Sequence, residues 1–230
     1  MTTDALAAWG RVRAQVDWTS AAAATPAPVE ASVDGLATWC AAQGRPTDPA
    51  RGDRLFAALT RSRTDASHGR VLSCALLARW QRMVLGVPQI VFRQGDAYAK
   101  GGRERYALTP DTHADFERCL RESTDSMVPL ASRAARAYLD VAFFHPFPDG
   151  NARLAMLTLG HVLEREGVRL DRTGPLQTTR YADDADGAAD LAALVGILIR
   201  ATQRRAMTSV GAREARPHAA HLPPASTLFS

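Results

Sequence analysis

Lysine and cysteine are scarce in this chain of 230 residues. Lys100 is the single lysine, so arginine supplies nearly all of the 28 basic side chains, and the net charge is +4. These charges are scattered, and no basic stripe alternates with aromatic residues, so we predict no nucleic-acid partner. The three cysteines lie too far apart for a zinc knuckle, and their odd number does not suggest a disulfide framework. A reducing, cytoplasmic location is therefore expected.

Long apolar runs are also missing. No stretch reaches the length of a membrane span, and the N-terminus lacks a basic leader followed by an apolar segment. We therefore predict neither a membrane partner nor a secretory signal. With 46% hydrophobic and 23% charged residues, the composition is that of an ordinary soluble globular protein, and the length suits one domain with tails.

Proline, glycine and alanine divide the chain into three predicted parts. Residues 1–52 form an N-terminal extension, residues 53–206 a compact domain and residues 207–230 a disordered tail. Within the extension, short helices are expected over 4–16 and 32–42, with an Ala/Pro-rich link at 21–28 and a loop at 44–49.

Apolar spacing predicts a mainly α-helical domain. Leu72, Leu76, Trp80 and Met83 form one apolar face of a helix between about 69 and 86. Further helices are expected over 109–122, 128–144, 151–163 and 186–206, the first with Thr109 as N-cap.

One short region favours β-structure. Val87–Phe92 is apolar and partly β-branched, and the turn-forming residues 94–96 separate it from 97–100. This pattern predicts a small hairpin, with Gly101 and Gly102 as its flexible end.

The segment His145 to Arg153, with the sequence HPFPDGNAR, carries the chemistry. His145 ends one predicted helix, and the next begins at Asn151 with free N–H groups that can bind phosphate. Arg153 adds a cation in the first turn, and Asp149 offers a hard oxygen ligand for Mg²⁺. His145 can accept a proton from a hydroxyl near neutral pH. These are the parts that phosphoryl or nucleotidyl transfer requires.

The segment resembles the motif of the Fic (filamentation-induced-by-cAMP) domain family, His-x-Phe-x-Asp/Glu-Gly-Asn-Gly/Lys-Arg-x-x-Arg. The matching positions are His145, Phe147, Asp149, Gly150, Asn151 and Arg153. The resemblance implies a mainly α, Fic-like helical core with a small β-hairpin, the flap, ahead of the motif. In that family the flap aligns a target segment by strand addition, a role open here to residues 87–100.

The resemblance also implies a reaction. AMP would pass from a nucleotide donor, ATP or another, to the hydroxyl of a protein or of a small molecule. His145 would be the general base and Asp149 the Mg²⁺ ligand. The nucleotide would be bound by the turn made of Phe147, Gly150, Asn151, Ala152 and Arg153, in which Phe147 anchors the loop in the core.

Two positions depart from the family motif. Ala152 replaces Gly or Lys, and its methyl group can crowd the approach of phosphate to the backbone. Met156 replaces the second arginine, which contacts the terminal phosphate of ATP in AMP-transferring members. Arg103, Arg105 and Arg180 are candidates to substitute for it.

These departures leave alternatives open. The enzyme could transfer the terminal phosphate, as the death-on-curing toxins do, or use a donor other than ATP. It could also be a catalytically silent binding module. The inhibitory pattern of the family, Ser/Thr-x-x-x-Glu-Gly/Asn, is missing from the sequence, so inhibition would need a separate partner protein or does not occur.

The remaining polar residues have structural interpretations. Three aspartates, Asp183, Asp184 and Asp186, are expected to compensate the dipole of the last helix. His161 is expected to be a satisfied core residue, and Cys74 a small hydrophobe. His218 and His221 have metal-like spacing but make a poor site on a predicted disordered segment.

Overall fold

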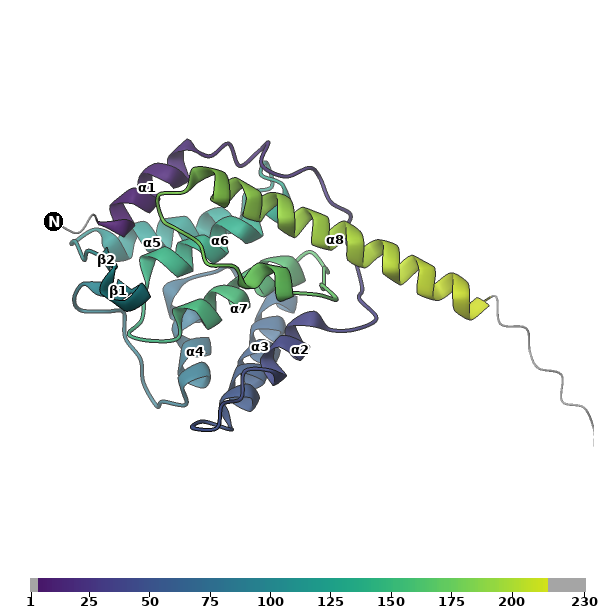
Figure 1. Ribbon diagram of the computed structural model, residues 1–230, viewed down its shortest axis with the longest axis horizontal. Helices are drawn as coiled ribbons and strands as arrows, with labels where there is room; N and C mark the ends of the chain where they lie inside the picture. The colour runs from purple at the N-terminus through teal and green to yellow at the C-terminus, as the bar shows by residue number, and fades with distance from the viewer. Residues whose placement is uncertain (1–3, 215–230) are drawn as a thin grey trace, which may run out of the picture.

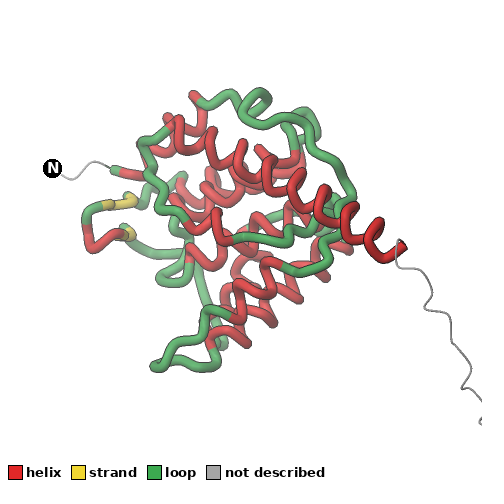
Figure 2. The backbone as a smooth tube through the Cα atoms, turned by 45° about the vertical axis from the view of Figure 1, so that its right-hand side comes forward, coloured by secondary structure: helices red, strands yellow, loops and turns green. Residues whose placement is uncertain are grey.

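The computed structural model describes residues 4–214, and the side chains of residues 4–209. Eight α-helices and a two-stranded antiparallel sheet make up its regular structure, with three short 3₁₀ helices between them (Figures 1 and 2). The α-helices are α1 (Ala5–Gln15), α2 (Gly35–Ala41), α3 (Arg51–Ser67), α4 (Cys74–Leu85), α5 (Thr112–Arg121), α6 (Leu130–Phe144), α7 (Asn151–Glu164) and α8 (Ala185–Glu214), and the strands are β1 (Ala97–Ala99) and β2 (Glu104–Tyr106). The predicted mainly α fold, with a hairpin ahead of the motif, is confirmed.

No helix in the described part of the chain combines the length and the apolar character that crossing a membrane requires.

Helices α6 and α7 occupy the centre of the molecule. They pack against each other, α8 and α1 cover α6, and α3 and α4 lie against α7. Both central helices are buried nearly all round, as their apolar sequences require. This burial fixes the two helix ends between which the motif loop is held.

The first helix is part of the same core. Trp9 is fully buried, and its indole N–H donates a 3.0 Å hydrogen bond to Asp140 of α6. Arg13 forms a 2.7 Å ion pair with the same carboxylate. Asp140 and Arg136 of α6 are therefore buried beneath the N-terminal segment. A buried carboxylate with both an ion pair and a hydrogen bond avoids the cost of an unpaired charge.

Capping residues set the ends of the helices. Helix α4 begins after the N-cap Ser73 and ends at Gly86, whose φ of 68° is left-handed. The expected start of α5 at Thr109 is wrong: the helix begins at Thr112, whose hydroxyl accepts the N–H of Thr109 at 2.9 Å.

The hairpin lies further along the chain than predicted. Residues 87–92 form no strand, and Arg93, which follows them, is hydrogen-bonded to the motif loop. Its backbone N–H donates to the carbonyl of Pro146, and its side chain donates to three further carbonyls. The strands are instead β1 and β2, and the turn between them is built by left-handed Lys100, Gly101 and Gly102.

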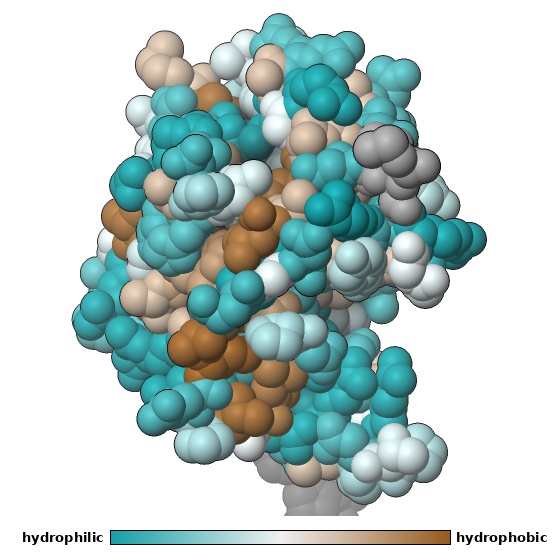
Figure 3. All heavy atoms as spheres, turned by 90° about the vertical axis from the view of Figure 1, so that its left-hand side faces the viewer, coloured by the Kyte–Doolittle hydropathy of each residue, from teal (hydrophilic) through white to brown (hydrophobic). Residues whose placement is uncertain are grey.

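The segment ahead of the hairpin leaves apolar surface. Val87 and Val91 are 36% and 64% exposed. The hairpin lies on the left-hand side of the molecule in Figure 1. Figure 3 turns this side toward the viewer and shows apolar side chains gathered on its surface.

Helix α8 extends beyond the predicted end at residue 206 and reaches Glu214. At its start, the Asp184 carboxylate accepts the N–H of Gly187 at 2.7 Å, in line with the predicted role at a helix N-terminus. Residues 215–230, with His218 and His221, lie outside the described residues.

His161 is a satisfied core residue, as predicted. Its side chain is fully buried, and its two ring nitrogens lie 3.0 and 2.9 Å from the carbonyl oxygens of Ser62 and Arg70.

Candidate active site

The motif loop joins the end of α6 to the start of α7, and left-handed backbone at two residues shapes it. His145 ends α6 with a φ of 46°, and Gly150 precedes α7 with a φ of 77°. A Cβ at Gly150 would lie 2.6 Å from the Nε2 atom of Gln81. Glycine is therefore needed both for the conformation and for the space.

Side chains from inside the molecule hold the loop. The amide of Asn151 donates to the carbonyl of Phe147 at 2.7 Å and accepts the N–H of Phe147 at 3.1 Å. Gln81 of α4 donates to the carbonyl of Asp149. Phe147 is 1% exposed, so it anchors the loop in the core as expected, and it does not line the pocket described below.

The start of α7 presents free backbone donors. Gly150 provides no side-chain cap, and the N–H groups of the first helical turn have no partner within a helix. These N–H groups and the positive end of the helix dipole favour a bound anion. Ala152 is exposed at this turn and lines the pocket, while Arg153 is almost buried beside it.

Asp149 is the acidic residue of the loop. Its side chain is 79% exposed, one oxygen accepts the N–H of Gly150 at 2.6 Å, and the other lies 3.3 Å from Arg153. Each oxygen has a further lone pair for a cation. Mg²⁺ commonly binds one or two carboxylates, several waters and substrate phosphates, so a single exposed carboxylate beside an anion site fits this ion.

A cavity of about 670 Å³ opens over the motif loop. The loop and the start of α7 form one wall. Other walls come from α2, the start of α3, the hairpin, α6 and the segment 177–180. Residues distant in sequence thus surround the loop.

Cations outnumber acids around this cavity. Among the described residues, Arg51, Lys100, Arg153 and Arg180 line it, against the single acid Asp149. The Nε atoms of Arg51 and Arg180 are buried and have no hydrogen-bond partner among the described residues. Burial and the nearby charge of Arg51 lower the pKa of Arg153, but an arginine stays protonated at neutral pH. The cavity therefore suits a polyanion such as a polyphosphate.

The hairpin forms the wall beside His145. The ring of Tyr106 stacks on the imidazole, with centroids 4.5 Å apart and planes at 16°. The Tyr106 hydroxyl donates to Glu104, which also accepts from Lys100 at 2.6 Å. Lys100 in turn donates to the carbonyl of Arg180 at 2.6 Å. This chain of contacts links the hairpin tip to the opposite wall.

The environment keeps His145 neutral. Burial lowers the pKa of its imidazole below the usual value of 6.5, and the charge of Arg93 acts in the same direction. Its Nδ1 atom is buried without a hydrogen-bond partner in the described residues. A neutral imidazole at physiological pH can accept a proton.

The positions that depart from the motif have clear locations. Met156 is 3% exposed and contributes apolar surface to the cavity wall. Of the three suggested replacement cations, Arg180 lines the cavity, whereas Arg105 pairs with Asp96 and Arg103 bonds the Lys100 carbonyl. Sequence reasoning missed Arg51, because it lies nearly one hundred residues before the motif and belongs to no local pattern.

Comparison with known protein families finds a match in the central region of the chain. Residues 72–163 match the model of the Fic/DOC family. No curated protein sequence matches the chain.

Several solved structures share the fold. IbpAFic2 in complex with adenylylated Cdc42 matches at 11% identity and a TM-score of 0.53, over 87% of this chain and 70% of that chain. IbpAFic2 covalently tethered to Cdc42 matches at 12% identity and a TM-score of 0.51, over 81% of this chain and 68% of that chain. A Fic domain containing signaling protein from Bacteroides thetaiotaomicron matches at 17% identity and a TM-score of 0.49, over 74% of each chain. At these identities, the first two matches concern the fold alone.

Proposed function

Because residues 72–163 form a Fic/DOC family segment, we propose that this protein is a Mg²⁺-dependent transferase that moves AMP from ATP to a hydroxyl. One observation carries the proposal: His145, Asp149 and the free N–H groups of α7 line one cavity with four cations. A base, a metal ligand and an anion site within one cavity are what nucleotidyl transfer requires.

The residues act by positioning and by proton transfer. The first turn of α7 and Arg153 bind phosphate oxygens, and the carboxylate of Asp149 would hold Mg²⁺, which neutralises phosphate charge when bound. His145 accepts the proton of the acceptor hydroxyl, and the oxygen of that hydroxyl bonds to the α-phosphorus. The bond between the α-phosphorus and the bridging oxygen breaks, and pyrophosphate leaves. The proton then passes from His145 to solvent.

Arg51 and Arg180 favour AMP transfer despite Met156. Both line the cavity with a buried Nε atom that has no partner in the described residues. Such guanidinium groups can bind the β- and γ-phosphates that the missing second arginine would otherwise bind. The conventional triphosphate orientation is therefore available to this chain.

A protein segment is the acceptor we favour. Asp4 forms a parallel bridge with Arg105 of β2, which covers one edge of the hairpin. Within the described residues, the outer edge of β1 has no pairing strand. An extended peptide can add to that edge, beside the half-buried His145. Cdc42 is adenylylated in the complex with IbpAFic2, which supports a protein acceptor by analogy of fold.

Transfer of label identifies the reaction. The purified protein is incubated with Mg²⁺ and ATP labelled at the α or the γ position, with its own hydroxyls and a cell extract as acceptors. We expect α-label and an AMP mass increment that require His145. Retained γ-label would instead establish phosphotransfer, and nucleotide binding without either label would favour a binding module. His68→Ala is the matched control, because His68 is exposed and does not line the cavity.

A further inference from the structure

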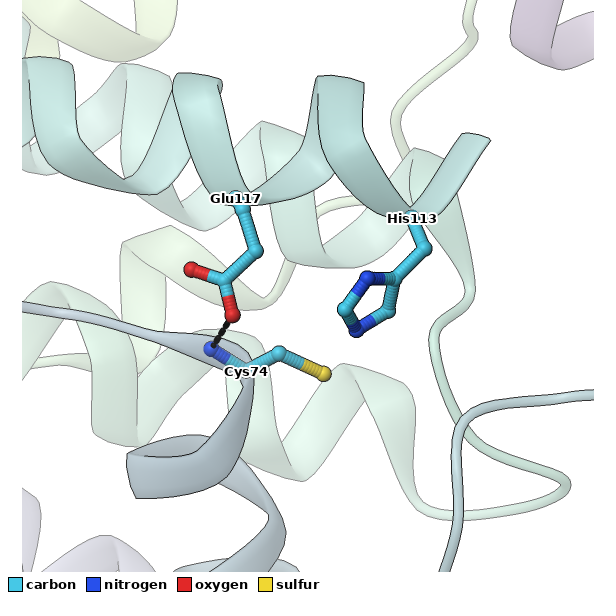
Figure 4. A group of neighbouring side chains, drawn as sticks. All are labelled: Cys74, His113 and Glu117. Carbon is cyan, nitrogen blue, oxygen red and sulfur yellow. Dashed lines mark hydrogen bonds between the residues drawn. The ribbon is translucent and has the colours of Figure 1, made fainter. Parts of the chain in front are cut away.

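Three potential metal ligands that are distant in the sequence come together outside the cavity. Cys74 is the first residue of α4, and His113 and Glu117 lie four residues apart on α5. One ligand atom from each side chain lies within 4.8 Å of the other two. In Figure 4 the sulfur of Cys74 points toward the imidazole of His113, and Glu117 lies above the backbone of Cys74.

The contacts of this cluster orient its ligands. One oxygen of Glu117 accepts the backbone N–H of Cys74 at 2.9 Å, and the same oxygen keeps a further lone pair for a cation. The ring of His113 packs edge-on against Phe92, with centroids 4.9 Å apart. The carboxylate is thus held by a hydrogen bond and the imidazole by a ring contact.

We propose that Cys74, His113 and Glu117 bind a zinc ion. Thiolate sulfur, imidazole nitrogen and carboxylate oxygen are the three ligand types that Zn²⁺ takes in proteins. The i, i+4 spacing places His113 and Glu117 on one face of α5, and Cys74 faces them from α4. His113 is exposed, so water can fill the fourth position of a tetrahedron. This proposal does not rest on the proposed transferase activity.

Binding requires only the loss of a proton. The sulfur of Cys74 bonds to the metal as a thiolate, and the thiol proton goes to solvent without any change of oxidation state. Burial and the charge of Glu117 raise the pKa of this thiol to about 12, so without metal it is protonated. A bound divalent cation stabilises the thiolate of Cys74 over the thiol, and the N-terminus of α4 also favours the thiolate.

A metal here would connect two elements near the motif. It would tie the start of α4 to α5, and His113 contacts Phe92, which directly precedes Arg93. Arg93 donates to the carbonyls of Phe144 and Pro146 on either side of His145. The zinc site would therefore support the segment that holds the motif loop.

Cobalt and zinc titrations of the full chain test the site. Metal-free protein at micromolar concentration is titrated with Co²⁺ and then with Zn²⁺. We expect one equivalent of metal and a thiolate-to-cobalt charge-transfer absorption that Zn²⁺ abolishes. Cys74→Ser should remove this absorption, and His113→Ala and Glu117→Gln should weaken binding by more than about tenfold, the loss seen even for outer-shell partners. Glu117→Gln retains an oxygen for the Cys74 N–H, so it separates coordination from helix capping.

Two control variants test whether other cysteine or histidine residues bind the metal. Cys119→Ser removes another buried cysteine, and the double variant His218→Ala/His221→Ala removes the histidines with metal-like spacing. Both should bind the metal as the unaltered chain does. The proposal is overturned if the unaltered chain binds no equivalent of either metal, if the double variant loses the absorption, or if Cys74→Ser keeps it. Circular dichroism of each variant, with Cys74→Ala as a second thiol-free variant, verifies that the fold is intact.

Discussion

The motif loop and the walls around it make different contributions to the same cavity. Residues 145–153 contain the proposed base, the proposed metal ligand and the proposed anion site within nine positions of one another. The walls supply Arg51, Tyr106, Lys100 and Arg180 from distant segments. The candidate catalytic groups are thus local in the sequence, while the charge and shape of the cavity around them are assembled by folding.

The two regions also differ in how they are held. Buried partners, above all Gln81 and Asn151, hold the loop by hydrogen bonds to its backbone. The hairpin wall is held by polar contacts at its tip, through Lys100 and Glu104. We therefore expect changes in the loop to affect the reaction step or the fold, and changes in the walls to affect donor affinity.

Replacement of the base should have the largest effect. His145→Ala is expected to lower kcat by about 10²–10⁴-fold, the contribution of general acid–base catalysis. The Kd for the nucleotide should hardly change, because in the proposed mechanism α7 and the arginines bind the phosphates. Single-turnover transfer and calorimetric binding measure the two quantities. Transfer at the unaltered rate would show that another residue is the base.

Acidification should reduce transfer through the same side chain. Burial lowers the pKa of His145 below 6.5, so the neutral, active form predominates above that pH. Below the lowered pKa, the rate should fall about tenfold per pH unit. A pH profile of kcat/KM, with nucleotide binding measured at each pH, tests this. An acid limb centred above pH 7 would contradict it.

Gly150→Ala should distort the loop. The added Cβ meets Gln81 at 2.6 Å and occupies a φ of 77°. Left-handed backbone alone costs an L-residue roughly 1–2 kcal/mol, so the free energy of unfolding should fall by at least that amount. Urea unfolding measures it. Gly95→Ala is the matched control, because no atom lies within 4 Å of its Cβ and its φ is not positive. Equal stability of the two variants would contradict the assigned constraint.

Removal of wall cations should weaken donor binding without slowing chemistry much. Arg51→Ala and Arg180→Ala are each expected to raise the Kd for ATP about tenfold, as the loss of a charge-assisted hydrogen bond predicts. Arg204→Ala, exposed and outside the cavity lining, should leave it unchanged. Equal effects of all three would mean that only overall charge matters.

Addition of a cation at the motif should have the smallest effect. Met156→Arg restores the family pattern in the cavity wall, and we expect ATP to bind at most about fivefold more tightly, in line with one partly exposed ion pair. The gain is small because four cations already line the cavity. Affinity is measured by calorimetry in the Met156→Arg chain and in the Met156→Leu control. A gain above fiftyfold would show that Arg51 and Arg180 do not replace the missing arginine.

Local patterns predicted much of the architecture. The apolar residues of α6 and α7 and the breakers between them gave these two helices to within two residues at each end. The hairpin was predicted too early in the chain because residues 87–92 include β-branched side chains. In the structure, the next residue, Arg93, is hydrogen-bonded to the motif loop, and residues 87–92 form no strand. Only the folded chain reveals these hydrogen bonds, since the carbonyl groups concerned lie more than fifty residues away.

The sequence by itself determined the helical class, the motif and the candidate catalytic groups. Helix periodicity and the nine-residue segment are short-range properties, so they can be recognised without a fold. Only the tertiary structure decided that Arg51 and Arg180 face the motif, that Tyr106 stacks on His145 and that Cys74 meets His113 and Glu117. These pairings follow from how the helices pack, and packing depends on side-chain fit across the whole core.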